Sequence, residues 1–239
     1  MKVLITGANG FVGKNLKATL RELEGIEIFS YDLNTDKELL GDYCKSCDFV
    51  YHLAGVNRAE NIEEYYTGNY GFTKKLTEYL ADGRNTCPIL YTSSVHAVLD
   101  NPYGRSKKAC EELLKEYEKN NRVNSYIYRL PNLFGKWCRP NYNSVIATFC
   151  YNISTGLPIH ISDPGISINF AYIEDLVKEF TAVLLGRGYR GVDGYYTIPI
   201  VHYVSLGQIA ELLYSFKEGY IPENLNSFES KLYATYLSY

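Results

Sequence analysis

The stretch Val3-Leu4-Ile5-Thr6-Gly7-Ala8-Asn9-Gly10-Phe11-Val12-Gly13 decides the fold of this 239-residue chain. Its first four residues predict a buried strand, and the apolar spacing across 12–23 predicts an amphipathic helix directly after it. The glycines allow the backbone to turn tightly and approach an anion, while the helix start offers free amides and a positive dipole. Strand, loop and helix together are typical of a dinucleotide diphosphate site, and an ordinary glycine turn is the alternative. The residues expected to contact the cofactor here are Gly7, Asn9, Gly10, Phe11, Val12 and Gly13.

Further along the chain, short β-branched or aromatic runs alternate with longer helical stretches. The strand runs are 3–6, 26–31, 49–53, 89–92 and 126–130, and the helical stretches are 12–23, 62–80 and 103–120. This alternation predicts an α/β fold with a Rossmann-type doubly wound parallel sheet covered by helices on both sides. The charged residues Glu111, Glu112, Lys115 and Glu118 are expected on a solvated helix face.

After residue 130, prolines and glycines break the chain into shorter pieces, with later helices expected over 174–185 and 205–217. We therefore predict a dinucleotide-binding Rossmann core over 1–130. The remainder, 131–239, is predicted to be mainly a small α/β substrate-binding lobe with segments that return to the core.

The composition limits the partners and the location of the protein. A net charge of −3 without a basic block argues against nucleic acid or anionic membrane as a partner. No run approaches the roughly 18 apolar residues that a membrane span needs. The six cysteines are scattered through a chain too large to need disulfides, so we expect a reducing cytoplasmic location. Cys44 and Cys47 have the spacing of a redox or zinc pair, but a structural zinc takes four ligands, so we expect no metal site.

An aspartate and a turn of small residues extend the predicted cofactor site. Asp32 ends the second strand 19 residues after Gly13, where a carboxylate accepts hydrogen bonds from the adenosine ribose and repels a 2′-phosphate. This favours NADH over NADPH, and the alternative is a loop aspartate that only ends the strand. At the end of the third strand, the turn Leu53-Ala54-Gly55 is expected to let the cofactor lie across the strand ends. His52 is expected to be a packed strand residue rather than a catalyst.

Ser94, Tyr103 and Lys107 form the predicted catalytic group. Ser94 ends the fourth strand, and Asn101-Pro102 is a typical helix start, so Tyr103 and Lys107 lie four residues apart on one helical face. We expect the ammonium of Lys107 and the helix amino terminus to lower the phenol pKa from its ordinary value of about 10. These groups suit hydride transfer to a ketone, with Tyr103 protonating the developing alkoxide. An unrelated surface tyrosine and lysine are the alternative.

Three motifs resemble the extended short-chain dehydrogenase/reductase family, whose members mostly act on nucleotide sugars. They are Gly7-x-x-Gly10-x-x-Gly13, the Ser94/Tyr103/Lys107 set and Arg129-Leu130-Pro131-Asn132-Leu133-Phe134-Gly135. The likeness extends over essentially the whole chain. It implies that Ser94 is the catalytic hydroxyl and contacts the substrate, that Lys107 also holds the nicotinamide ribose, and that Asn69 belongs to the cofactor site.

The segment 131–151 resembles one branch of that family more closely, the reductases of capsular polysaccharide synthesis. These enzymes reduce the C4 ketone of a UDP-linked 2-acetamido-2,6-dideoxy-4-hexulose on the route to UDP-N-acetyl-L-fucosamine. The resemblance therefore implies a nucleotide-sugar 4-ketoreductase. The enzymes of this branch use NADPH, whereas Asp32 favours NADH here, so the cofactor is written NAD(P)H. They also carry a carboxy-terminal cupin epimerase domain, which we expect to be absent from this chain.

Residues after the core are predicted to bind the UDP-sugar. The family often has an arginine to hold the nucleotide diphosphate in a region where this chain has Ile168 and Asn169. Lys136 and Arg139 therefore become the candidate phosphate partners, with two solvated surface cations as the alternative. Asn132 is expected to bind phosphate or else to cap a loop. Trp137 is expected to line the sugar or uracil pocket or else to belong to the core.

Other functions stay open for the same sequence. A nucleotide-sugar 4-epimerase would use the same Ser94/Tyr103/Lys107 set but would retain its NAD through both half-reactions. A non-catalytic NAD(P)-sensing Rossmann module usually lacks the tyrosine or the lysine, and both are present. A 4,6-dehydratase would need an Asp-Glu dipeptide where this chain has Val95-His96. By analogy with the family we also expect a homodimer that packs the helices over 62–80 and 103–120.

Overall fold

Five parallel strands form the sheet of the first structural unit, which comprises residues 1–130 and 179–197. The computed structural model describes all 239 residues of the chain. The strands are β1 (Lys2–Thr6), β2 (Glu27–Tyr31), β3 (Phe49–His52), β4 (Ile89–Ser94) and β5 (Ser125–Leu130), in the order β2-β1-β3-β4-β5. Every neighbouring pair is parallel, which confirms the predicted Rossmann-type sheet. The strand order reverses at β1, and parallel sheets bind ligands at the carboxyl ends of the strands beside such a reversal.

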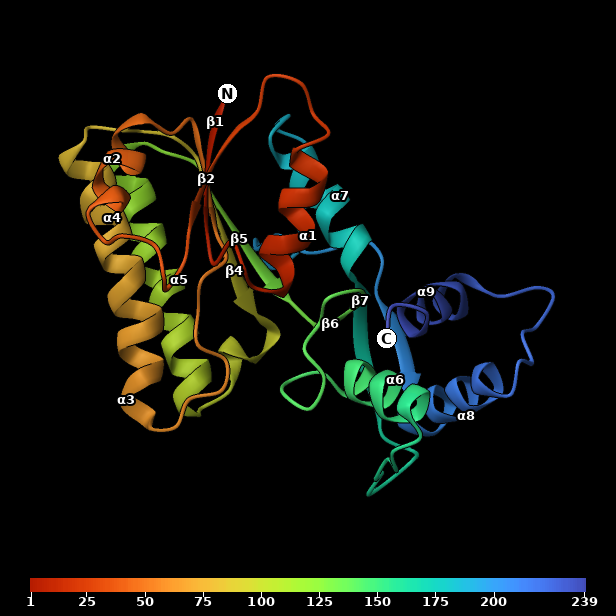
Figure 1. The fold of residues 1–239 in the computed structure, drawn as a ribbon. Coiled ribbons are helices and arrows are strands. Elements are labelled where there is room, and N and C mark those ends of the chain that lie inside the picture. Colours follow the sequence, from red (N-terminus) through yellow and green to blue (C-terminus); the bar gives the residue numbers. More distant parts are fainter. The chain divides into compact units, whose positions relative to one another are not determined.

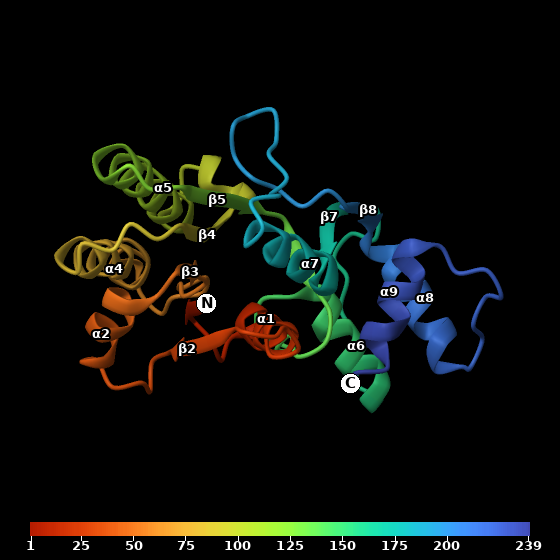
Figure 2. The same cartoon turned by 90° about the horizontal axis from the view of Figure 1, so that it is seen from above.

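Helices cover both faces of this sheet (Figure 1). One face carries α2 (Leu39–Ser46), α4 (Phe72–Asp82) and α5 (Pro102–Asn121), and the other carries α1 (Phe11–Leu20) and the end of α7 (Ile173–Val183) (Figure 2). Under α4 and α5, alternate strand residues such as Val50 and Ile127 pack with Leu76 and Leu114 in one apolar core. Burial of each such side chain contributes about 1.5–3 kcal/mol to folding. None of the helices combines the length and apolar content needed to cross a bilayer.

The helix expected over 62–80 consists of three consecutive pieces. These are α3 (Ile62–Tyr65), the π-helical segment η1 (Tyr66–Gly71) and α4. A π-helical turn inside a longer helix often lies at a functional site. Here it places Asn69 in the interior with 2% exposure.

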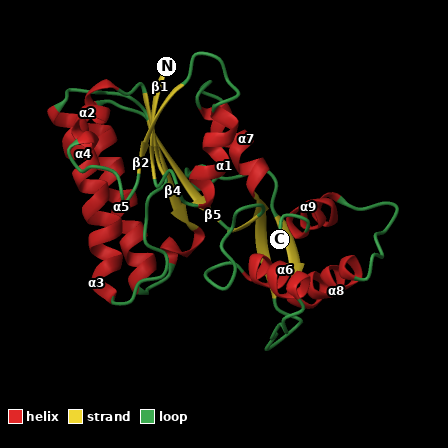
Figure 3. Cartoon of the chain, in the orientation of Figure 1, coloured by secondary structure: helices red, strands yellow, loops and turns green.

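The second unit comprises residues 131–178 and 198–239 and is built on a three-stranded sheet. Its strands β6 (Asn132–Phe134), β7 (Ser167–Tyr172) and β8 (His202–Ser205) lie in that order, with β6–β7 parallel and β7–β8 antiparallel. The helices α6 (Val145–Thr155), α8 (Leu206–Lys217) and α9 (Ser227–Tyr236) belong to it (Figure 3). The ring of Phe134 packs against Phe170 and Phe228, with centroids 6.3 and 5.7 Å away. The unit therefore has its own aromatic core.

Within the returning part of the first unit, residues 189–197 lie beside the edge strand β5. Tyr196 N donates to Ile127 O (2.9 Å), and Arg129 N donates to Tyr196 O (3.1 Å). The returning segment thus pairs with β5, and it places Tyr195 next to Arg129.

Candidate active site

The loop after β1 forms a cradle that requires glycine. Gly7 has a φ of +68°, and a Cβ built on it would lie 2.8 Å from Ala54 N. A Cβ on Gly13 would lie 2.3 Å from Gly7 O, so α1 packs directly on the loop. No side chain caps α1 at Gly10, and the amides of a first helical turn bind anions.

Asp32 lies beside this cradle, at the end of β2. Its Oδ2 accepts from Asn9 N (2.6 Å), and its Oδ1 accepts from Leu33 N (2.8 Å). These bonds hold the carboxylate at the edge of the loop, where the sequence predicts the adenosine ribose. Lys17 of α1 reaches the same loop and donates to Asn9 Oδ1 (2.9 Å).

The end of β3 connects the glycine loop to α5. A Cβ on Gly55 would lie 2.9 Å from Asn69 Oδ1 and 3.1 Å from Lys107 Nζ. Asn69 accepts from Val56 N (2.7 Å) and donates to Ser106 Oγ (2.9 Å). The buried amide of Asn69 therefore joins this turn to the helix that carries Lys107.

His52 is a structural residue in this region. It is fully buried, with Nδ1 2.8 Å from Thr6 Oγ1 and Nε2 2.9 Å from Thr73 Oγ1. Burial, together with the charge of Lys107, lowers the pKa of His52 to about 3. The neutral imidazole therefore links β1, β3 and α4, in agreement with the prediction of a packed strand residue.

Tyr103 lies in the first turn of α5, next to Ser94. The helix begins as predicted, with Asn101 Oδ1 accepting from Gly104 N (2.8 Å). Burial raises the pKa of Tyr103 above its ordinary value, while a hydrogen bond with Ser94 lowers it in part. The prediction of a lowered pKa for Tyr103 is therefore wrong, because loss of solvent is the largest influence on this phenol. A phenol that stays protonated near neutral pH is a suitable proton donor.

Lys107 lies one turn further along α5, with 5% exposure. Its Nζ donates to Thr92 O (2.9 Å) and lies 4.9 Å from the ring centroid of Tyr91. Burial lowers the pKa of Lys107 to about 8, against the opposing influence of Cys110 and Glu111. The ammonium is thus aimed at the carboxyl end of β4, beside Gly55.

These features fit a nicotinamide dinucleotide. A side chain at either Gly7 or Gly13 would fill the cradle, no side chain caps the following helix, and a carboxylate stands at the end of β2. The phenol and the ammonium of α5 lie at the same carboxyl edge of the sheet as the cradle. By contrast, no group of three or more His, Cys, Asp or Glu side chains could hold a metal ion. Cys44 and Cys47 are buried in the core.

The other predicted substrate residues, Asn132, Lys136, Trp137 and Arg139, belong to the second unit. Asn132 and Arg139 are exposed, and the Arg139 guanidinium lies 5.0 Å from the ring centroid of Tyr142. Lys136 pairs with Glu174 at 3.6 Å and lies 5.3 Å from the ring centroid of Trp137. Trp137 is 51% exposed, which excludes the alternative of a core residue.

Sequence reasoning missed part of the surroundings of the site. Glu111 was expected on the solvated face of α5, yet it is 1% exposed and paired with Arg129 of β5. Its position four residues after Lys107 on one helical face is the signal that could have identified it. The main-chain role of Thr92 and the contact of Lys17 with the loop have no signal in the sequence.

Comparison with known proteins identifies a matching family, a similar enzyme and a similar crystal structure. The model of the NAD dependent epimerase/dehydratase family matches residues 3–190. The UDP-2-acetamido-2,6-beta-L-arabino-hexul-4-ose reductase of Pseudomonas aeruginosa is 43% identical, over 100% of this chain and 65% of that protein. The crystal structure of the capsular polysaccharide assembling protein CapF from Staphylococcus aureus matches with a TM-score of 0.92 and 44% identity, over 100% of this chain and 65% of that one.

More distant structures share the fold. The UDP-glucuronic acid 4-epimerase of Bacillus cereus, solved in complex with NAD, has a TM-score of 0.82 at 21% identity and is covered over 98% of its length. The chain spans about 65% of the length of the reductase and of CapF. Because the family model covers most of its residues, the chain belongs to the NAD-dependent epimerase/dehydratase family, that is, to the extended short-chain dehydrogenases/reductases.

Proposed function

We propose that this protein reduces the C4 ketone of a UDP-linked 2-acetamido-2,6-dideoxy-4-hexulose with NAD(P)H, in the synthesis of a capsular or other surface polysaccharide precursor on the UDP-N-acetyl-L-fucosamine route. The observation that carries the proposal is the grouping of Ser94, Tyr103 and Lys107 at the carboxyl edge of the sheet, beside the glycine cradle. The 43% identity to a named UDP-sugar 4-ketoreductase supports the choice of substrate.

Each residue of the catalytic group has a separate role in this proposal. A reduced nicotinamide, when bound, supplies the hydride that forms the new C–H bond at C4. Tyr103 gives its phenolic proton to the carbonyl oxygen as negative charge develops there, and Ser94 donates a hydrogen bond to the same oxygen. Lys107 holds the nicotinamide ribose and offsets the charge left on the phenolate. The raised pKa of Tyr103 supports this direction of proton transfer, since the phenol enters the reaction protonated.

For the cofactor we propose NADH in preference to NADPH. The carboxylate of Asp32 is held at the loop by the amides of Asn9 and Leu33. A fixed negative charge there accepts hydrogen bonds from ribose hydroxyls and repels a 2′-phosphate. Lys17, which donates to Asn9 in the same loop, is the nearby cation that opposes this preference.

The remaining proposals concern the substrate lobe, the assembly and the location. Asn132, Lys136, Trp137 and Arg139 are proposed to bind the UDP-sugar, a role supported by the exposure of Trp137 and Arg139. The homodimer through the helices over 62–80 and 103–120 is proposed by analogy with the family. A cytoplasmic location agrees with the six free cysteines.

An assay with purified components tests the reaction. The protein is incubated with the UDP-4-ketosugar and either NADH or NADPH, the loss of reduced cofactor is followed by absorbance, and the product is identified by NMR. We expect one cofactor to be oxidised for each sugar reduced. A Tyr103→Phe variant should bind cofactor nearly as tightly but react about 10²–10⁴-fold more slowly, the usual contribution of a general acid. Equal rates for the variant and the wild type would refute the assigned role of Tyr103.

Two other outcomes would identify different functions. A nucleotide-sugar 4-epimerase retains its cofactor, so NAD that stays bound to the purified protein after desalting, together with interconversion of 4-epimers, would replace the proposal. An NAD(P)-sensing module would bind the cofactor and leave every 4-ketosugar unchanged.

A further inference from the structure

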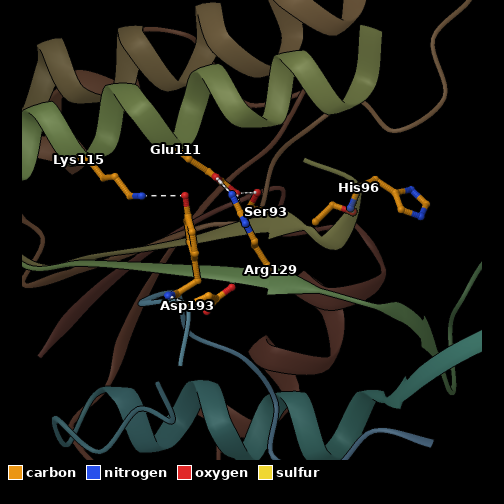
Figure 4. A network of polar contacts seen from close by, with 8 residues as sticks. Ser93, His96, Glu111, Lys115, Arg129 and Asp193 are labelled. Atoms are coloured by element: carbon orange, nitrogen blue, oxygen red, sulfur yellow. Dashed lines mark hydrogen bonds and ion pairs between the residues drawn. The ribbon is translucent and has the colours of Figure 1, made fainter. Parts of the chain in front are cut away.

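A polar cluster of Ser93, Glu111 and Arg129 lies on β4, α5 and β5 (Figure 4). In the chain, Ser93 directly precedes Ser94, and Glu111 lies four residues after Lys107. Ser93 and Arg129 are register partners on β4 and β5, and Glu111 reaches them from α5. Ser93 Oγ donates to Glu111 Oε1 (2.5 Å). Arg129 binds both carboxylate oxygens, with Nε 3.0 Å from Oε1 and Nη2 2.7 Å from Oε2. The carboxylate thus joins the helix to both strands.

The burial of this cluster indicates that it fixes the positions of the helix and strands more than it adds to the free energy of unfolding. Glu111 is 1% exposed, and the side chain of Arg129 is 19% exposed. The desolvation of a buried ion pair offsets most of its attraction, whereas a bidentate arginine–carboxylate pair strictly limits where its two partners lie. The Arg129 guanidinium is also covered by the ring of Tyr195, with its Cζ 3.6 Å from the ring centroid. Lys115 donates to the hydroxyl of that ring (2.7 Å).

Three consecutive residues of β4 link this cluster to the proposed chemistry. Thr92 O accepts from Lys107 Nζ (2.9 Å), Ser93 binds Glu111, and Ser94 lies next to Tyr103. Lys107 and Glu111 are one turn apart on α5, so the helix is attached to β4 at two adjacent points. A shift of α5 along the strand would break both attachments and move the phenol and the ammonium together.

We infer that Glu111, held by Ser93 and Arg129, is a positioning residue that sets the register of α5 against β4 and so orients Tyr103 and Lys107, an inference that rests on the proposed reductase function. The carboxylate also acts on Lys107 by its charge. Titratable groups beside Lys107 include His52 of β3, Tyr91 of β4, and Cys110 and Glu111 of α5, with Tyr103 one helical turn away. Glu111 raises the pKa of Lys107 against the burial that lowers it to about 8.

A Glu111→Gln variant tests this inference. Loss of the carboxylate lowers the pKa of Lys107 further, so Lys107 loses its proton at a lower pH. The alkaline limb of the kcat/KM profile therefore shifts to lower pH. We expect a shift of about half a pH unit, with kcat about tenfold lower because α5 is less well held. NADH affinity, measured by fluorescence titration, should weaken over the same alkaline range. Glu112→Gln is the matched control, since it removes an exposed carboxylate from the adjacent position of the same helix.

A second variant separates positioning from folding. Glu111→Gln with Arg129→Gln removes both charges and leaves no unpaired buried ion, so it should melt near the wild-type temperature. It should still show the lower kcat and the shifted alkaline limb. A wild-type pH profile and wild-type NADH affinity in either variant would overturn the inference. Because the NADH titration contains no sugar, a wild type that binds NADH but reduces no 4-ketosugar would refute the proposed function and leave the titration as the test of this inference.

Discussion

Substitution of Gly13 by alanine tests the cofactor cradle most severely. The new Cβ would lie 2.3 Å from Gly7 O and 2.8 Å from Ala8 C, both backbone atoms, where ordinary van der Waals contact begins at 3.4 Å. The loop or the start of α1 must therefore move by about 1 Å, since neither contact can be relieved by a side-chain rotation. Overpacking of this kind costs about 1–3 kcal/mol. The higher helix propensity of alanine adds up to about 1 kcal/mol of stability, which is less than the cost of the clash, so the variant should be less stable than the wild type.

The assays are thermal melting and NADH titration by fluorescence. For a net loss of about 2 kcal/mol, Tm should fall by about 4–8 °C. The displaced loop should lose at least one of the charge-assisted hydrogen bonds that we propose it donates to the cofactor diphosphate, and NADH binding should weaken by about 10–100-fold. Gly41→Ala is the control with the opposite sign. It lies inside α2, and its Cβ would meet only the ring of Tyr79 at 3.6 Å, so Tm should stay level or rise. A Gly13→Ala variant that melts and binds NADH like the wild type would refute the assignment of this glycine loop as the cofactor site.

Two further predictions concern the cofactor preference and the buried histidine. An Asp32→Ser variant should bind NADH about tenfold more weakly and NADPH more tightly, since it lacks the carboxylate that we propose to bind the ribose and repel a 2′-phosphate. Unchanged Kd values for both cofactors would show that Asp32 does not face the ribose. The pKa of His52 is about 3 in the folded chain and about 6.5 in the unfolded chain. Below pH 6.5 the unfolded chain therefore binds a proton that the folded chain excludes, and stability falls towards pH 3 by up to about 1.4 kcal/mol for each pH unit. Melting curves from pH 7 to pH 4 should show a shallower loss in His52→Gln, and equal slopes in both proteins would contradict this assignment.

Local patterns predicted the parts of the structure that local interactions determine. The glycine spacing of Gly7 and Gly13 and the helix start at Asn101-Pro102 are each set within one strand–loop–helix segment, and the structure has them where the sequence placed them. By contrast, α6 and α9 were not predicted. Both begin at capping residues, Ser144 and Asn226, whose signal is weak among the surrounding prolines, glycines and tyrosines.

The failures at the site have a shared physical cause, because they depend on what lies across space from a residue. The pattern of α5 alone predicts that Glu111 is solvated. Its partner Arg129 lies on β5, 18 residues further along the chain. The lowered pKa expected for Tyr103 rests on the nearby ammonium and the helix amino terminus. Burial raises the pKa and is the largest influence on it. Desolvation and distant partners become visible only once the chain is folded.

In the proposed reaction, the nicotinamide delivers a hydride to C4 of the sugar and Tyr103 delivers a proton to O4. The most direct measurement uses NADH deuterated at the transferable position, with the product analysed by mass spectrometry and NMR. We expect one deuterium at C4 of a 4-hydroxy UDP-sugar, formed by the wild type and about 10²–10⁴-fold more slowly by Tyr103→Phe. Deuterium at any other carbon, or a product without deuterium, would contradict it.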